Sequence, residues 1–215
     1  MFLFVALPSG MATLIGKVTD SRLLINLSAG LTRIAILIGY MFVISFVPDI
    51  KRVFMYHGAE HKTVYCNEAG LPLTPENARK FSRLHPRCGT AFLFLVMFIS
   101  ILIGAIADQL LFALFGIEKL TFVGRILRSV LTIPVVTGVS YEVLKGLAHS
   151  DSKLAHMLRW PGLQMQRLTT RQPDNKMLEC AIVAMNVALH GMPKDAPRTQ
   201  EGYAVLHSYK ESDPE

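Results

Sequence analysis

The sequence predicts an all-α, polytopic membrane protein with about three transmembrane helices, and its composition is the first reason. Of its 215 residues, 51% are hydrophobic and only 18% are charged, and the mean hydropathy is +0.38. The second reason is that the apolar residues are concentrated in long runs. The clearest run, Thr90–Ala107, holds no charged residue. Because a helix needs about 20 apolar residues to cross the hydrocarbon core, such runs indicate membrane spans rather than a soluble core.

Three stretches of the chain are expected to be transmembrane helices: residues 31–47, 90–107 and 126–144. The first carries Arg33 near its end, from where a long side chain can reach the interface. The third is the weakest of the three because it contains Arg128, Pro134 and Glu142.

Residues 1–30 are expected to be a partial apolar segment followed by a loop. Met1–Gly16 is apolar but short, and Pro8 interrupts it. A signal peptide is the competing interpretation, but no basic residue precedes the apolar run and no clear small-residue cleavage site follows it. We therefore expect the remainder of a span whose beginning is missing.

Lysine and arginine are unevenly distributed over the segments that connect the spans. They are frequent in 48–89 and in 145–191, whereas Lys119 is the only one between Asp108 and Gly124. Cytoplasmic loops carry an excess of these residues. The loop 48–89 (the motif loop) and the region after the third span should therefore be cytoplasmic, and 108–125 should be an external turn.

The motif loop is expected to be helical in part. Asp49–Cys66 can continue the preceding span into water as a helix. Thr74 followed by Pro75 is typical of an N-cap and first helical position, which opens a short second helix. The pair His85-Pro86 then ends it, because the residue before proline avoids the α region.

The region 145–191 is expected to contain an amphipathic helix, and 192–215 a disordered tail. Apolar residues recur at helical spacing between Asn175 and Leu189. The tail is rich in Pro, Lys, Asp, Glu and Ser. The formal net charge of +6 fits contact with anionic lipid head groups better than nucleic acid, because the basic residues flank the spans and lack interleaved aromatics. A second copy of the chain or another membrane protein is the other partner considered.

The motif loop contains the strongest chemical signal, the string His57-Gly-Ala-Glu60-His61. Two imidazoles four residues apart share one face of a helix and can bind one metal ion. The order matches the HxxEH form of zinc peptidase motif, in which the glutamate acts as general base on metal-activated water. Glu60 is therefore the expected catalytic residue, and zinc is the expected divalent ion.

Further metal ligands are expected at His85, Cys88 and Glu142. Cys88 could be a ligand or a polarised thiolate, or else a small buried hydrophobe. Glu142 could be a ligand or proton acceptor, or else a structural partner of Arg128 or Lys145 or a hydrated interfacial group. No disulfide is expected, because the three cysteines show no CxxC spacing and the two nearest the motif face a reducing compartment.

Four strings resemble the YqhQ-like bacterial membrane proteins (DUF1385), a family grouped as a domain of unknown function: RVFMYHGAEHKTVYCNEAG, LTPENARKFSRLHPRCGTAF, IPVVTGVSYEVLK and PGLQMQRLTTRQPD. The resemblance covers roughly residues 31–190. The matched positions are His57, Glu60, His61, His85, Cys88, Tyr141, Glu142, Thr169, Thr170 and Pro173. It implies a multi-pass protein of the bacterial inner membrane, in a family described as predicted metal-dependent enzymes without an established reaction. Members begin with a glycine-rich segment resembling GGQAVIEGVMMR, which is absent here, so a truncated start is expected; if that segment completes the site, this chain would not act alone.

Three functions are consistent with this pattern. The first is a metal-dependent hydrolase at the cytoplasmic membrane interface. The alternative is a non-enzymatic membrane assembly or interaction factor, in which the same cluster is a structural metal site or a polar network. The third, a small transporter with Glu142 and the histidines as an ion relay, would require oligomerisation because so few spans are available.

Overall fold

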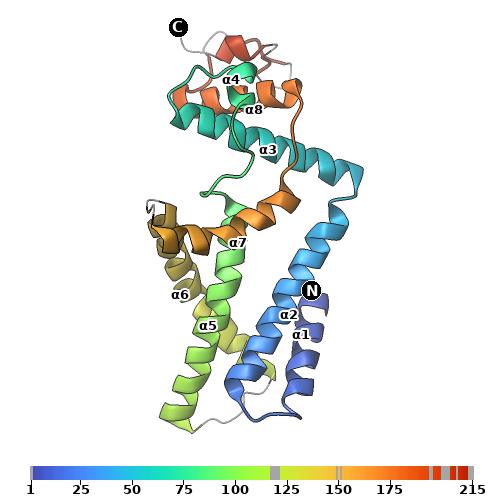
Figure 1. Cartoon of the computed structure of the whole chain (residues 1–215), viewed down its shortest axis with the longest axis vertical. Helices are drawn as coiled ribbons and strands as arrows, with labels where there is room; N and C mark the ends of the chain where they lie inside the picture. The colour runs from blue at the N-terminus through green and yellow to red at the C-terminus, as the bar shows by residue number, and fades with distance from the viewer. Residues whose placement is uncertain are drawn as a thin grey trace. The chain divides into compact units, whose positions relative to one another are not determined.

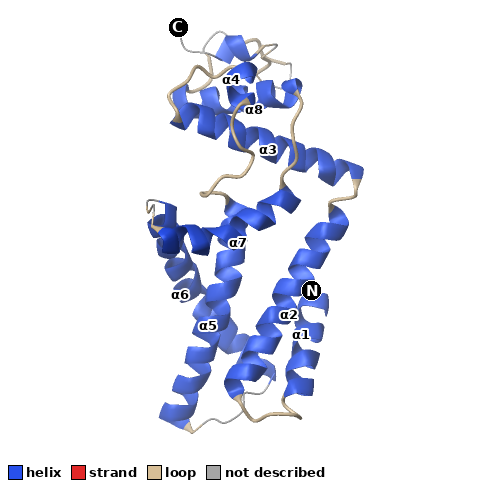
Figure 2. Ribbon diagram, in the orientation of Figure 1, coloured by secondary structure: helices blue, strands red, loops and turns tan. Residues whose placement is uncertain are grey.

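The computed structural model describes residues 2–116, 122–148, 150, 152–193, 196–199, 204–206 and 208–212. Over these residues the chain is all-α, as predicted, with eight α-helices and one short 3-10 helix (Figures 1 and 2). The helices are α1 (Phe2–Ile15), α2 (Arg22–Ile44), α3 (Pro48–Glu68), α4 (Pro75–Arg79), α5 (Gly89–Phe115), α6 (Phe122–Ala148), α7 (Lys153–Thr169) and α8 (Asn175–His190), followed by η1 (Tyr209–Ser212). The helices belong to two compact units, residues 1–43 with 86–165 and residues 44–85 with 166–215.

The first unit contains three helices that are long and apolar enough to cross a membrane: Leu23–Ile44 in α2, Phe92–Phe115 in α5 and Val130–Leu147 in α6. Only 6%, 6% and 11% of their most apolar windows are buried inside the structure. A soluble protein would bury these side chains, whereas a bilayer covers them without further protein. The prediction of a membrane protein with three spans is confirmed in this form.

The helices α2, α5 and α6 are all longer than the expected spans, and Asp108 explains the length of α5. The sequence pattern placed the end of the span before Asp108, but α5 continues to Phe115, and Gly116, with φ of 64°, caps its end. Asn26 Nδ2 of α2 donates to Asp108 Oδ2 at 2.9 Å, and Arg128 Nη1 of α6 lies 2.7 Å from Asp108 Oδ1. Because the carboxylate is paired inside the unit, it does not end the helix.

The contact between Arg128 and Asp108 bears on the expected pairing of Glu142 with Arg128. Arg128, which was considered as its partner, pairs with Asp108 and also donates from Nη1 to the carbonyl of Gly104 at 2.9 Å. Glu142 itself is exposed on α6. The charge that joins the helices of the first unit is therefore Asp108, which was not among the expected functional residues.

The second unit consists of α3, α4, α8, η1 and the end of α7. Pro48 begins α3, and Asp49 lies in its first turn, where a negative charge is favourable. Thr74 Oγ1 caps α4 by accepting from Asn77 N at 3.3 Å, and Asp174 caps α8 by accepting from Met177 N at 2.9 Å.

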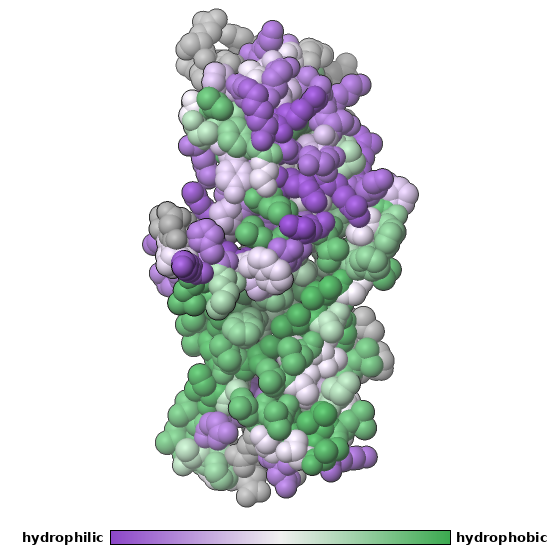
Figure 3. Space-filling view, in the orientation of Figure 1, coloured by the Kyte–Doolittle hydropathy of each residue, from purple (hydrophilic) through white to green (hydrophobic). Residues whose placement is uncertain are grey.

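α8 packs against α3 and α4 over a small apolar core. The core residues are Ala59, Cys66, Ala78, Met177 and Leu178, with Met55, Leu73, Phe81 and Ala181 packed on them. Full burial of a leucine such as Leu178 contributes about 1.5–3 kcal/mol. Figure 3 shows hydrophilic side chains over α3, α4 and α8 and hydrophobic side chains over the helices of the first unit.

Parts of four expected segments lie outside the described residues. They are residue 1 of the segment 1–30, residues 117–121 of the turn at 108–125, residues 149 and 151 of the region 145–191, and residues 194–195, 200–203, 207 and 213–215 of the tail at 192–215.

Candidate metal centre

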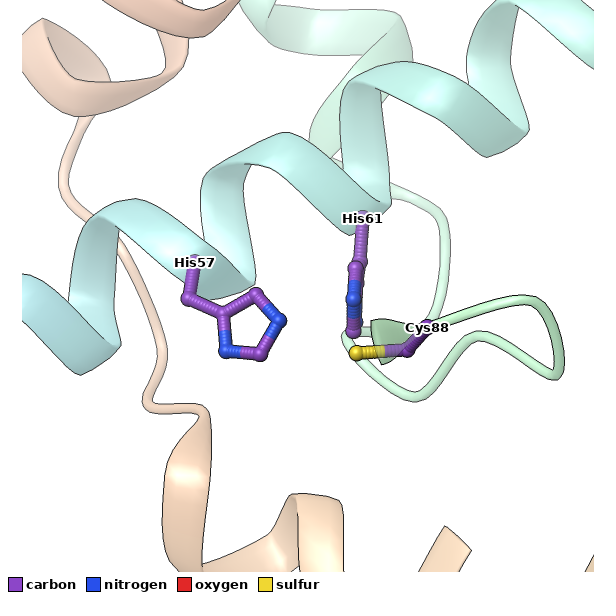
Figure 4. A group of neighbouring side chains, drawn as sticks. All are labelled: His57, His61 and Cys88. Atoms are coloured by element: carbon purple, nitrogen blue, oxygen red, sulfur yellow. The ribbon is translucent and has the colours of Figure 1, made fainter. Parts of the chain in front are cut away.

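His57 and His61 lie one turn apart on the same side of α3, as Figure 4 shows. Their ring centroids are 4.4 Å apart with an interplanar angle of 67°. A ring nitrogen of one lies within 4.8 Å of a ring nitrogen of the other. His57 is half-buried and His61 is buried, so the pair is partly shielded from water.

The Nδ1 atoms of both histidines face main-chain carbonyls. His57 Nδ1 lies 2.8 Å from the carbonyl oxygen of Thr169, and His61 Nδ1 lies 2.6 Å from that of Arg83. A carbonyl oxygen can only accept, so we assign the Nδ1 proton to each neutral ring from this network. The lone pair of each ring is then on Nε2. Metal-binding histidines are typically oriented in this way, with the other ring nitrogen donating to a carbonyl or carboxylate.

His85 adds a third imidazole to this group within the second unit. Its ring centroid lies 5.8 Å from that of His61 and 4.4 Å from that of Tyr65. Its Nε2 atom lies 3.3 Å from Glu68 Oε2, and its side chain is only 6% exposed. The structure thus brings His57, His61 and His85 together, and it adds an imidazole–carboxylate pair that the sequence analysis did not anticipate.

The main chain of His85 is held by a residue 81 positions further along the chain. Gln166 Oε1 accepts from His85 N, and Gln166 Nε2 donates to His85 O, both at 2.7 Å. Gln166 is completely buried. This double hydrogen bond fixes the segment that carries His85 against the end of α7.

Glu68, rather than Glu60, is the carboxylate that lies with the histidines. Both glutamates are exposed on α3, but the helical position of Glu60 is about 100° from that of His61. Glu68 follows His61 by seven residues, two helical turns, which returns it to the same face. That spacing was visible in the sequence, but it lies outside the HxxEH string. Tyr65 and Gln166 were also missed, and only the i+4 spacing of Tyr65 from His61 could have indicated its place.

The segments that contact the histidines are packed closely against α3. Arg171 N donates to Phe54 O at 2.8 Å, and a Cβ added to Gly58 would lie 2.1 Å from Arg171 O. Glycine is therefore required at position 58 for the chain at 169–171 to approach the helix. Arg83 Nη1 donates to Oγ1 of Thr170 at 2.9 Å and to the carbonyl of the same residue.

Lys62 of α3 holds the chain between α4 and His85 in place. Its side chain is buried, and Nζ donates to the carbonyls of Arg79 and Phe81. Burial, together with the positive charges of Arg83 and Arg79, lowers the pKa of Lys62. Lys62, like Gln166, therefore constrains the chain that leads to His85.

The remaining expected ligands, Cys88 and Glu142, belong to the first unit. Cys88 is the buried N-cap of α5, three residues beyond His85, and Sγ accepts from Thr90 N at 3.4 Å. Figure 4 draws it with the two histidines. The other two thiols differ in exposure: Cys66 is buried and Cys180 is exposed. Burial raises the pKa of Cys66. All three cysteines are free of disulfides.

The comparisons with known proteins agree with the resemblance found in the four strings. The model of a family described as "Protein of unknown function (DUF1385)" matches residues 1–191. The chain belongs to this family. It is 40% identical over 161 residues to a protein of Bacillus subtilis (strain 168) called "Uncharacterized protein YqhQ", an alignment that covers 74% of this chain. The chain spans about half of that relative, 47% of its length. No solved structure matches.

Proposed function

We propose that this chain is a metal-dependent hydrolase whose site is built on α3. The observation that carries the proposal is the pairing of both Nδ1 atoms, of His57 and His61, with main-chain carbonyls. This arrangement presents two Nε2 lone pairs on one side of a helix, which is the requirement for binding one transition-metal ion.

The proposed ligands are His57 and His61, both in the second unit. His85 is held in the same unit by Gln166. Imidazole ligands favour zinc and other transition metals over magnesium or calcium, which prefer oxygen. Ligands from two imidazoles would leave coordination positions for water or substrate.

A divalent ion bound by these residues would act as a Lewis acid toward a water molecule and a carbonyl or phosphoryl oxygen. The chain's own contribution is proton transfer by His85 and Glu68. Glu68 Oε2 lies 3.3 Å from His85 Nε2, and the pair can accept a proton and hold it between them. We propose that Glu68 takes the role first expected of Glu60, and that Tyr65, against the His85 ring, fixes the ring's orientation.

The proposed location is the cytoplasmic side of the bacterial inner membrane. α3 begins four residues after the span at Leu23–Ile44 ends, and the span at Phe92–Phe115 begins seven residues after His85. Lysine and arginine are frequent in the connecting segments, which supports the cytoplasmic side. Substrate would reach the site from the membrane–water interface, where anionic lipid head groups are the expected contacts.

The proposal is tested with the full-length protein purified in detergent. We expect it to hydrolyse at least one member of a panel of nitrophenyl carboxylic and phosphoric esters, to lose this activity with a chelator, and to regain it with zinc. His57→Ala and His61→Ala should be inactive, whereas His190→Ala, at the exposed end of α8, should behave as the wild type. Hydrolysis that persists after complete metal removal, or in both histidine variants, would contradict the proposal.

A structural metal site in a membrane assembly factor is the second candidate. It is favoured by the hydrogen bonds that fix the main chain around the histidines, from Gln166 to His85 and from His61 to Arg83. Such bonds stabilise a fold as well as they position an active site. In that case Glu68→Gln should leave all functions intact, while His57→Ala should lower the amount of folded protein in the membrane.

A further inference from the structure

Three arginines gather where the chain segments that hold the histidines meet. Arg83 donates to the carbonyl and the hydroxyl of Thr170, the residue that precedes Arg171 in the chain. Arg167 precedes Arg171 by four residues at the end of α7. Burial, and after it the charges of Arg171 and Arg167, lower the pKa of Arg83. All three belong to the second unit.

No carboxylate compensates these charges in the part of the chain that the structure describes. The ion pairs His85–Glu68 and Arg128–Asp108 do not involve these arginines. Arg171 Nε is buried without a hydrogen-bond partner among the described residues, and Nη2 reaches only Ser45 Oγ at 3.5 Å. Like charges held close together repel each other, and a buried donor without a partner costs free energy. Both costs are removed when an anion with several oxygens binds between the guanidiniums.

We propose that Arg83, Arg167 and Arg171 bind a phosphate group, and that this group belongs to the substrate of the proposed hydrolase. Phosphate fits better than a carboxylate because it offers more acceptor oxygens and more charge to three planar donors. The assignment to substrate rests on the proposed function. The same chain segments contact the arginine site and the histidines, which supports this assignment. The carbonyl oxygen of Arg83 faces His61 Nδ1. The carbonyl oxygen of Thr169, the residue before Thr170, faces His57 Nδ1.

The phosphate could come from a lipid head group or from a soluble compound, and the two sources give different results in one experiment. Full-length protein in detergent, stripped of metal by a chelator, is titrated calorimetrically with inorganic phosphate, with pyrophosphate and with short-chain phosphatidic acid. Phosphatidylcholine of the same chain length is the control for the acyl chains. Tighter binding of phosphatidic acid than of both soluble anions assigns the site to a lipid, and the reverse order assigns it to a soluble phosphate.

The arginine variants decide whether this site is the one that binds. Arg167→Gln and Arg171→Gln should each weaken the binding of the preferred anion at least about tenfold, because each removes a charged hydrogen-bond donor. Arg52→Gln removes the same charge from an exposed position of α3 and should change the affinity less than twofold. Arg167 is exposed, so its variant should unfold at the wild-type temperature.

The proposal is overturned if the wild type binds none of the anions, or if Arg52→Gln weakens binding as much as Arg167→Gln does. It is distinguished from the metal proposal because the titration is done without metal. If the wild type takes up no metal yet shows the expected arginine dependence, the hydrolase proposal fails and the phosphate site stands.

Discussion

Gln166 holds His85 by its main chain, accepting from the His85 amide and donating to the His85 carbonyl at 2.7 Å each. Both groups of His85 are thereby satisfied inside the second unit, where Gln166 has no exposed surface. The imidazole of His85 lies near the side chains of Glu68, His61 and Tyr65. A residue 81 positions away thus sets where the third imidazole lies.

Replacing Gln166 by leucine should destabilise the protein, because the amide and the carbonyl of His85 lose their partners in a buried place. Each unsatisfied group costs about 1–3 kcal/mol. Gln166→Glu should cost less, since the carboxylate can still accept from the His85 amide. The measurement is the free energy of unfolding in detergent. Gln172→Ala, at an exposed position, is the control, and equal stability of the leucine variant and this control would refute the assigned role.

Glu68 and Glu60 provide a matched pair of carboxylates on one helix. If Glu68 is the proton-accepting residue, Glu68→Gln should lower the rate of ester hydrolysis by about 10²–10⁴-fold while metal content stays at the wild-type level. Glu60→Gln should leave both quantities unchanged, because the helical position of Glu60 is about 100° from that of His61. The check is a rate and a metal content for each variant; the reverse pattern would restore the role that the HxxEH string suggests for Glu60.

Gly58 is predicted to tolerate no side chain. A Cβ at this position would lie 2.1 Å from the carbonyl oxygen of Arg171, and main-chain atoms cannot move away cheaply. Gly58→Ala should therefore lower the free energy of unfolding by about 1–3 kcal/mol, despite the higher helix propensity of alanine. Gly39→Ala, in α2 with no atom within 4 Å of the added Cβ, is the control. Thermal unfolding that is equally unaffected in both variants would contradict the close approach.

The carboxylate of Asp108 should need its cation, Arg128, for the first unit to fold. Arg128→Leu leaves this carboxylate without its cation among three apolar helices. The pair is partly buried, so the loss should lie below the about 3–5 kcal/mol that breaking a fully buried pair costs. The double variant Asp108→Leu with Arg128→Leu should recover most of that loss, because no unpaired charge remains. The readout is the amount of folded protein in the membrane fraction. A double variant as poor as the single one would show that the pair is not the cause.

Features that depend on the spacing of nearby residues could be predicted from the sequence. The apolar runs predicted the three spans, and the four-residue spacing placed His57 and His61 on one side of α3. Contacts between distant segments left no such pattern: the bonds from Gln166 to His85 and from Thr169 to His57 join residues 81 and 112 positions apart. The sequence pattern predicted that the span ends before Asp108, because a charged residue is costly in a membrane. The partners of Asp108, Asn26 and Arg128, come from two other helices, and the local pattern does not show them.

The central claim, that His57 and His61 bind a metal ion through Nε2, is tested most directly by X-ray absorption of the zinc-loaded, full-length protein. We expect stoichiometric zinc with imidazole nitrogens at about 2.0–2.1 Å. His57→Ala and His61→Ala should each remove one imidazole contribution. Protein that takes up no stoichiometric zinc, or a zinc spectrum that neither His57→Ala nor His61→Ala changes, would contradict it.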